Sequence, residues 1–137
     1  MTDVTNAQRA LWMVLITSLA APFFASLVDV ALTLASPLFD FLLPPRADKA
    51  LGEVAIGAYA WGALPSTVGA LGLVPYVLQT GTYGWLQAAV AGVIAFAAAH
   101  VVWPIPAGAA IPFLAFLAGL VAIGMRAMLI SGGILKA

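Results

Sequence analysis

Cysteine is absent from this 137-residue sequence, which excludes disulfides, thiol chemistry, iron–sulfur clusters and covalently attached haem. Charge is also scarce, because Asp, Glu, Lys and Arg together make up 7% of the residues, against about a quarter in ordinary soluble domains. The formal net charge is zero and the five cations are scattered, so we expect no nucleic-acid partner. A water-soluble fold could not cover its surface with so few charged groups.

The sequence is instead rich in apolar residues. They make up 64% of the sequence, and the mean hydropathy is +1.12. A helix that crosses the hydrocarbon core of a bilayer needs about 20 such residues, so the chain has room for about four spans and for no separate soluble domain. The apolar blocks lack the alternation of apolar and polar residues that a membrane β-barrel requires, which leaves helices. The sequence predicts an all-α, integral membrane protein.

Proline, glycine and charged residues divide the chain into four apolar blocks. We predict one transmembrane domain over residues 1–137, with spans at 10–28 (extended over 29–43), 54–78, 84–103 and 107–130. The connections are short and turn-like, which is typical of antiparallel neighbours in a helix bundle. The sequence therefore predicts a four-helix up-and-down bundle.

An even number of spans puts both termini on one side of the membrane. Arg9, Arg126 and Lys136 then share that side, while Arg46 and Lys49 lie on the other. The positive-inside rule favours cytoplasmic termini by three cations to two, in a cell (inner) membrane. The apolar run after Arg9 resembles the start of a secretory signal, but it continues without a break, so we expect it to remain as a span.

The first apolar block is too long for one upright span. Its 34 residues, 10–43, would measure about 51 Å as a helix, against a hydrocarbon core of about 30 Å. Arg9 and Asp29 lie about 30 Å apart on such a helix, which predicts Asp29 at the membrane edge opposite the termini, within reach of water. The rest of the block either prolongs the helix or forms a re-entrant or interfacial amphipathic segment.

Polar residues of this block share one helical face across Asp29. They are Ser18, Ser26, Asp29, Thr33, Ser36 and Asp40. Three interpretations stay open: burial inside the bundle, contact with the boundary of water and lipid, or the lining of a pathway for an ion or substrate. For the third interpretation the candidate residues are Ser26, Asp29, Thr33 and Ser36.

Proline and small residues mark the other blocks. Pro65 lies in the middle of the second block, where it should kink the helix and free the carbonyl of Trp61, so that Pro65 and Ser66 join the candidate pathway residues. Stripes of small residues follow one face of three blocks: Ala55, Ala58, Gly62, Pro65, Ser66, Gly69 and Gly72; Ala88, Gly92, Ala95 and Ala99; Ala115, Gly119 and Ala122. We interpret them first as packing within the chain, and second as an interface with a partner or a second copy.

Chemistry-bearing motifs are missing. The single histidine, His100, could supply one axial ligand to a haem or chlorophyll-type macrocycle, but we interpret it as an interfacial residue beside Trp103 and expect no cofactor and no metal. No nucleophile motif of the G-x-S-x-G type and no phosphate-binding loop is present, so we expect no enzyme.

Two functional hypotheses follow from the sequence. The first is a small non-catalytic accessory or structural subunit, held in the lipid bilayer beside other membrane subunits or beside itself in a homo-oligomer. The alternative is a minimal oligomeric transporter or channel for an ion or small solute, with the polar residues around Asp29 as its pathway.

Overall fold

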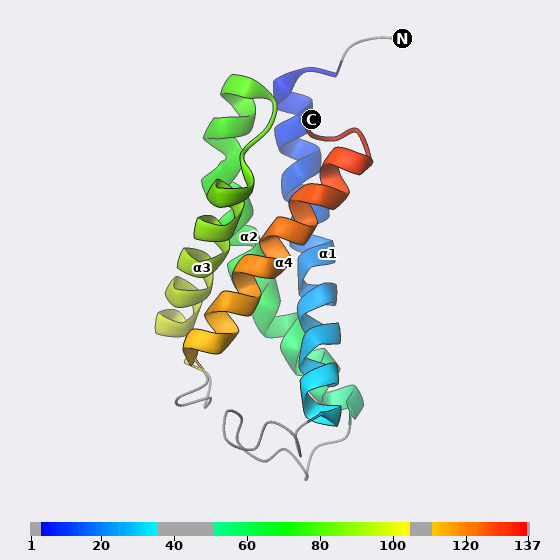
Figure 1. Cartoon of the computed structure of the whole chain (residues 1–137), viewed down its shortest axis with the longest axis vertical. Helices are drawn as coiled ribbons and strands as arrows, with labels where there is room; N and C mark the ends of the chain where they lie inside the picture. Colours follow the sequence, from blue (N-terminus) through cyan, green and yellow to red (C-terminus); the bar gives the residue numbers. More distant parts are fainter. Residues whose placement is uncertain (1–3, 36–50, 105–110, 137) are drawn as a thin grey trace.

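The computed structural model describes residues 4–35, 51–104 and 111–136, and this part of the chain forms four helices. They are α1 (Asn6–Leu34), α2 (Leu51–Thr80), α3 (Trp85–Val102) and α4 (Ile111–Ser131). Successive helices run antiparallel, and the start of α1 lies at the same end of the molecule as the end of α4 (Figure 1). We call this end the terminal end and the opposite one the far end. The predicted all-α fold with four packed helices is confirmed.

The first helix starts earlier than the sequence predicted and passes Asp29 without a break. Its start is fixed by a capping box, in which the Thr5 hydroxyl accepts from the Gln8 amide at 3.2 Å and the Gln8 side chain accepts from the Thr5 amide at 3.0 Å. Its 29 residues measure about 43 Å. The helix is over-long up to Leu34, while residues 36–43 of the predicted extension lie outside the described residues.

The two hairpins differ in length. Helix α2 has 30 residues, close to the 29 of α1, whereas α3 has 18 and α4 has 21. At about 1.5 Å per residue, the first pair is more than 10 Å longer than the second. As a result, α1 and α2 continue past α3 and α4 at the far end (Figure 1).

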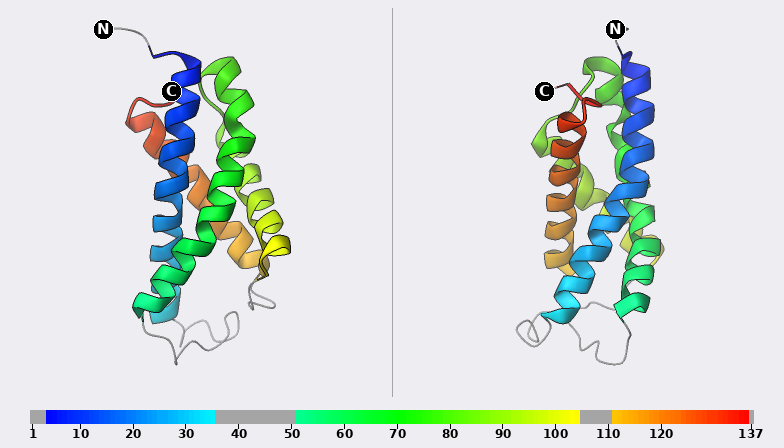
Figure 2. Two further views of the ribbon diagram at one scale, coloured as in Figure 1. Left: turned by 180° about the vertical axis from the view of Figure 1, so that it is seen from behind. Right: turned by 90° about the vertical axis from the view of Figure 1, so that its right-hand side faces the viewer.

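Proline bends the first helix where it packs on the second. Pro22 lies inside α1, where it removes a backbone hydrogen bond, and the helix changes direction near its middle (Figure 2). Gly62 of α2 faces this point, since a β-carbon on Gly62 would lie 3.5 Å from the Pro22 Cα and 3.5 Å from the Ala25 Cβ. The small residue lets the bent helix approach closely.

Glycines also bring the later helices together. A β-carbon on Gly69 of α2 would lie 3.4 Å from the Ala95 Cβ of α3, and one on Gly119 of α4 would lie 3.2 Å from a methyl carbon of Val93. At these positions the small-residue stripes serve packing within the chain. Gly72 is an exception, because nothing lies within 4 Å of a β-carbon there.

The core is concentrated near the terminal end. Its buried residues are Ala10, Met13, Ala70, Leu73, Val77, Tyr83, Ala88, Leu129 and Leu135. Helix α4 meets α1 near this end and diverges from it toward the far end (Figure 1). The bundle is therefore closed at the terminal end and more loosely packed at the far end.

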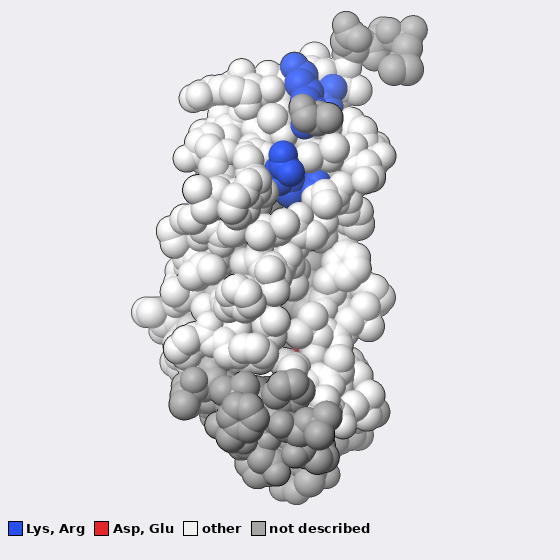
Figure 3. Space-filling model, viewed as in Figure 1, with Lys and Arg blue, Asp and Glu red and all other residues white. Residues whose placement is uncertain are grey.

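Hydrogen bonds between distant segments hold the terminal end together. The Arg9 guanidinium donates to the carbonyls of Gly133 at 3.2 Å and Ile134 at 2.9 Å, and the Lys136 amide donates to the Gly81 carbonyl at 3.1 Å. These bonds join the start of α1, the α2–α3 connection and the segment after α4. Basic side chains gather at this end of the visible face (Figure 3).

Candidate solute cavity

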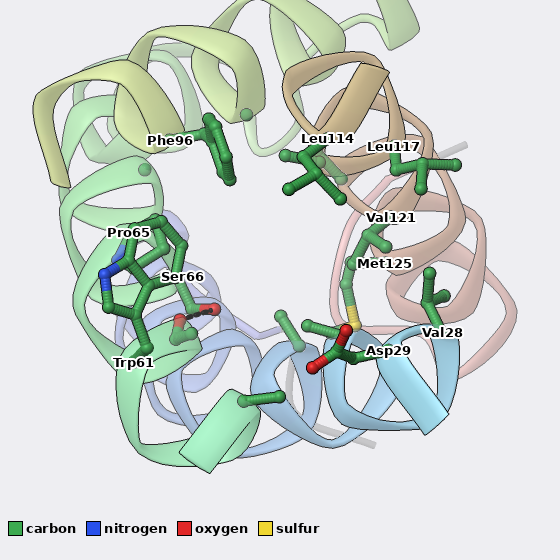
Figure 4. Close-up of a pocket in the computed structure, with 18 of the residues that line it drawn as sticks. Val28, Asp29, Trp61, Pro65, Ser66, Phe96, Leu114, Leu117, Val121 and Met125 are labelled. Atoms are coloured by element: carbon green, nitrogen blue, oxygen red, sulfur yellow. Dashed lines mark hydrogen bonds between the residues drawn. The ribbon is translucent and has the colours of Figure 1, made fainter. Parts of the chain in front are cut away.

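A cavity of about 700 Å³ lies between the two hairpins, and all four helices contribute to its lining (Figure 4). Along α2 the lining runs from Glu53 to Leu73, a length of about 30 Å. The wall is mainly apolar. Its larger aliphatic and sulfur-containing side chains are those of Val28, Leu32, Val54, Leu73, Leu114, Leu117, Val121 and Met125.

Aromatic residues form a fixed part of the wall. The rings of Trp61 and Phe96 pack edge to face, with centroids 5.2 Å apart and an angle of 65° between the planes. The Trp61 indole N–H also donates to the Trp103 carbonyl at 2.8 Å, just after the end of α3. Because these two contacts hold the indole ring in one orientation, it presents a constant surface to the cavity.

Asp29 and Glu53 are the charged residues that the described part of the chain contributes to the lining, and they lie at the same level. The Ser26 hydroxyl of α1 donates to the Ala55 carbonyl of α2 at 2.9 Å, which fixes the register of the two antiparallel helices. Asp29 follows Ser26 by one turn, and Glu53 precedes Ala55 by two residues. Both carboxylates therefore belong to the far end of the cavity. Asp29 is half-buried at the edge of the opening (Figure 4), and Glu53 is exposed.

Pro65 and Ser66 line the cavity deeper in the bundle (Figure 4). The Ser66 hydroxyl donates to the Gly62 carbonyl at 2.6 Å, and the Thr67 hydroxyl donates to the Ala63 carbonyl at 2.8 Å. Since Pro65 has no backbone N–H, it gives the Trp61 carbonyl no helical hydrogen bond, and the two hydroxyls bond elsewhere. The Trp61 carbonyl of α2 therefore lacks its helical hydrogen bond, which places a polar backbone group next to the apolar part of the wall.

The polar residues of α1 have separate roles. Asp29 lines the cavity, whereas Ser26 is 8% exposed and joins α1 to α2 outside the lining. The Thr33 hydroxyl donates to the Asp29 carbonyl of its own helix at 2.8 Å. Ser36 lies outside the described residues. Of the predicted pathway residues, the structure therefore brings Asp29, Pro65 and Ser66 to one cavity and places Ser26 and Thr33 outside it.

Thr17 is a cavity residue that the sequence did not indicate. Its hydroxyl oxygen is buried and has no hydrogen-bond partner within the described residues, and the same holds for Ser18. An unpartnered buried hydroxyl costs about 1–3 kcal/mol, which a water molecule or a polar group of a solute would offset. A polar residue inside an apolar block was the one available signal for it.

Trp61, Phe96 and Met125 were also not predicted as site residues. They come from three different helices, and each belongs to an ordinary apolar run in the sequence. What makes them neighbours of Asp29 in one lining is the tilt of the helices, for which one sequence carries no pattern.

Among the described residues, the arginine and lysine side chains Arg9, Arg126 and Lys136 lie at the opposite end from Asp29 and Glu53. Arg126, for example, donates from Nε to the Tyr83 carbonyl in the α2–α3 connection at 2.6 Å. The Tyr83 side chain is buried there, which raises the pKa of its phenol to about 12, although the nearby Arg126 acts in the opposite direction. None of Arg9, Arg126 and Lys136 belongs to the cavity lining.

His100 lies in the last turn of α3, half-buried and outside the cavity lining. Among the described residues, no three metal-ligating side chains come close enough to hold an ion. Comparisons with protein-family models, with curated proteins and with solved structures find no match for this chain. Function is therefore inferred from the cavity, whose apolar wall and acidic far end are suited to binding a small organic solute.

Proposed function

We propose that the chain is an integral membrane protein with four spans. All four helices are long and apolar enough to cross a bilayer. Large apolar side chains lie exposed along them, for example Leu19 at 66%, Ile94 at 62% and Val101 at 80%. Such exposure is unfavourable in water and ordinary in lipid. In this topology the side of the termini carries three cationic residues and the other side carries two, which supports cytoplasmic termini in a cell (inner) membrane.

Within the membrane, we propose that the chain is a small non-catalytic transporter whose pathway is the cavity. One observation carries this proposal: the lining extends about 30 Å along α2, which equals the thickness of the hydrocarbon core. A pocket that only filled a packing defect would not follow the helix over that length. Bent helices such as α1 at Pro22 and α2 at Pro65 are common where transporters bind their substrates.

An accessory or structural subunit is the second candidate. Two glycines outside the cavity lining face open space, because a β-carbon on Gly72 or Gly124 would meet nothing within 4 Å. Helices of a partner subunit or of a second copy pack closely on such positions in membranes. Purification in mild detergent separates a transporter from a subunit of a larger complex, since such a subunit remains bound to other proteins whereas a transporter purifies alone or as a homo-oligomer.

Binding of a solute in the cavity tests the main proposal. The probe is terminally brominated octanol, because bromine quenches tryptophan fluorescence on contact. The protein carries Trp61 as its single tryptophan, with phenylalanine at the other three tryptophans, and is placed in lipid nanodiscs. A second protein with Trp85 alone, which is 61% exposed, reports probe that dissolves in lipid.

We expect saturable quenching of Trp61 and linear quenching of Trp85. Val121→Phe fills part of the cavity and should abolish the saturable component. Val101→Phe makes the same change at a side chain that is 80% exposed and should leave it intact. Quenching of Trp61 that is linear, or that is unaffected by Val121→Phe, would exclude the cavity as a solute site.

A further inference from the structure

We infer that the terminal end binds the headgroup of an anionic phospholipid, in a groove between the start of α1 and the segment after α4. This inference rests on the proposed placement in a membrane and is independent of the solute cavity. It starts from a second cavity, of about 650 Å³, which we call the terminal groove. Thr5, Arg9 and Trp12 line it on one side, and residues 132–134 line it on the other.

Cationic residues of three segments meet at this end, where neutral backbone groups hold them (Figure 3). The guanidinium groups of Arg9 and Arg126 donate to carbonyls of the segment after α4 and of the α2–α3 connection. A β-carbon on Gly81 would lie 2.9 Å from both the Asn6 Oδ1 and the Lys136 Cε, so the Lys136 side chain lies beside the first turn of α1. Since a carbonyl carries no net charge, these bonds position the cationic residues without neutralising them.

The positive charge of this end persists when the whole sequence is counted. The side of the termini carries Arg9, Arg126 and Lys136, and its one acidic side chain is that of Asp3, which lies outside the described residues. Three positive charges against one negative charge leave an excess of two. An excess of this sign attracts anionic groups, and basic residues at a membrane surface bind anionic lipids for this reason.

The Arg9 guanidinium itself points to an anionic ligand. Its Nη1 makes both bonds to the carbonyls, whereas its Nε is buried and donates to no acceptor within the part of the chain that the structure describes. An unsatisfied buried N–H is unfavourable. A phosphate group presents several acceptor oxygens in the planar arrangement that a guanidinium matches, so a phosphate in the groove supplies what Arg9 lacks.

The surroundings favour a lipid phosphate over a free one. Trp12 is 51% exposed and follows Arg9 by one turn, and tryptophan side chains prefer the headgroup level of a membrane. Leu15 and Leu19 continue the same face of α1 toward the membrane interior, at 46% and 66% exposure. A phosphate bound beside Arg9 therefore leaves its acyl chains along an exposed apolar face.

Brominated phospholipids test this inference, because bromine on an acyl chain quenches tryptophan fluorescence on contact. The protein carries Trp12 as its single tryptophan, with phenylalanine at the other three, and is placed in bilayers of unbrominated phosphatidylcholine. Brominated phosphatidylglycerol, which is anionic, is compared with brominated phosphatidylcholine, which has no net charge. A second protein with Trp103 alone, which is 55% exposed just after α3, reports lipid at the far end.

We expect phosphatidylglycerol to bind beside Trp12 at least fivefold more tightly than phosphatidylcholine, since one cationic side chain near the surface contributes about that factor. At Trp103 there should be no such preference. Raising the salt concentration from about 0.1 M to about 1 M should reduce the preference at Trp12, because it screens exposed charges.

Charge-removing variants locate the preference. Lys136→Gln keeps the backbone bond to Gly81 and should lower the preference about two- to fivefold. Arg9→Gln should lower it further, and Arg9→Lys, which restores the charge, should recover most of it. Lys49→Gln makes the same change as Lys136→Gln on the other side of the membrane and should have no effect.

Several results would overturn the inference. One is equal binding of the two lipids beside Trp12, and another is an equal preference for phosphatidylglycerol at Trp12 and Trp103. A preference that Lys136→Gln and Arg9→Gln both leave unchanged would mean that these cationic residues do not bind the headgroup. Displacement of brominated phosphatidylglycerol by glycerol 1-phosphate in solution would show a site for soluble phosphates instead. Each of these results leaves solute binding at Trp61 untouched, so the two proposals fail separately.

Discussion

Gly92 of α3 lies so close to Ala122 of α4 that a β-carbon on Gly92 would be 2.9 Å from the Ala122 Cβ. The same β-carbon would lie 2.8 Å from the carbonyl oxygen of Ala118, a backbone atom that cannot turn away. The second hairpin is therefore tightly packed at this point. The cavity lies between this hairpin and the α1–α2 hairpin, where the side chains do not close the space.

Gly92→Ala should destabilise the bundle. The added methyl group overlaps α4, and overpacking of this kind costs about 1–3 kcal/mol. Gly124→Ala is the matched control, since nothing lies within 4 Å of a β-carbon there. Reversible unfolding in mixed micelles, followed by circular dichroism, measures the two free energies of unfolding. Equal values for the two variants would contradict the close approach of α3 and α4.

Ser26→Ala should also destabilise the protein, but without affecting solute binding. It removes the hydrogen bond to the Ala55 carbonyl, a loss of about 1 kcal/mol between helices in a membrane. Ser131→Ala, at an exposed position, should change the free energy of unfolding much less. The quenching assay on Trp61 gives the second readout. If Ser26→Ala weakened solute binding by more free energy than it removed from the stability of the fold, Ser26 would be a pathway residue after all, which would contradict this prediction.

Ionisation of Tyr83 should weaken the fold at high pH. Burial raises the pKa of this phenol from 10.0 in an unfolded chain to about 12 in the folded protein. Its contribution to stability is therefore complete below pH 10 and is lost as the pH rises through about 12. A shift of this size corresponds to about 2–3 kcal/mol.

Unfolding measured between about pH 9 and about pH 12 checks this pH dependence. Tyr83→Phe should flatten the decline in the free energy of unfolding. Tyr76→Phe, at a side chain that is 45% exposed, should keep the decline of the unchanged protein. An identical decline in both variants would mean that another group is responsible.

The helices could be predicted from the sequence better than the cavity could. Long apolar runs separated by proline and charge determine how many spanning helices form, and the described residues form four. Helix bounds were less predictable, because the start of α1 depends on the cap formed by Thr5 and Gln8.

The cavity depends on how the helices lie against one another. Ser26 and Asp29 share a face of α1, but their surroundings differ. Ser26 lies opposite Ala55 of α2 and donates a hydrogen bond to its carbonyl, whereas Asp29, one turn further along, lines the cavity. Trp61 and Phe96 meet only once α2 and α3 are packed. Periodicity within one helix identifies a polar face, but the choice among burial, lipid boundary and pathway needs the neighbouring helix.

Access of water to Ser66 tests the central claim most directly. The chain has no cysteine, so Ser66→Cys provides a single thiol in the lining, and Ile94→Cys provides one at a side chain that is 62% exposed on the outer surface of α3. A membrane-impermeant thiol reagent is applied to right-side-out and to inverted membrane vesicles. A transport pathway predicts that Ser66→Cys reacts in both preparations and faster than Ile94→Cys in each. Reaction of Ser66→Cys from one side alone, or at the rate of Ile94→Cys, would contradict a pathway through the cavity.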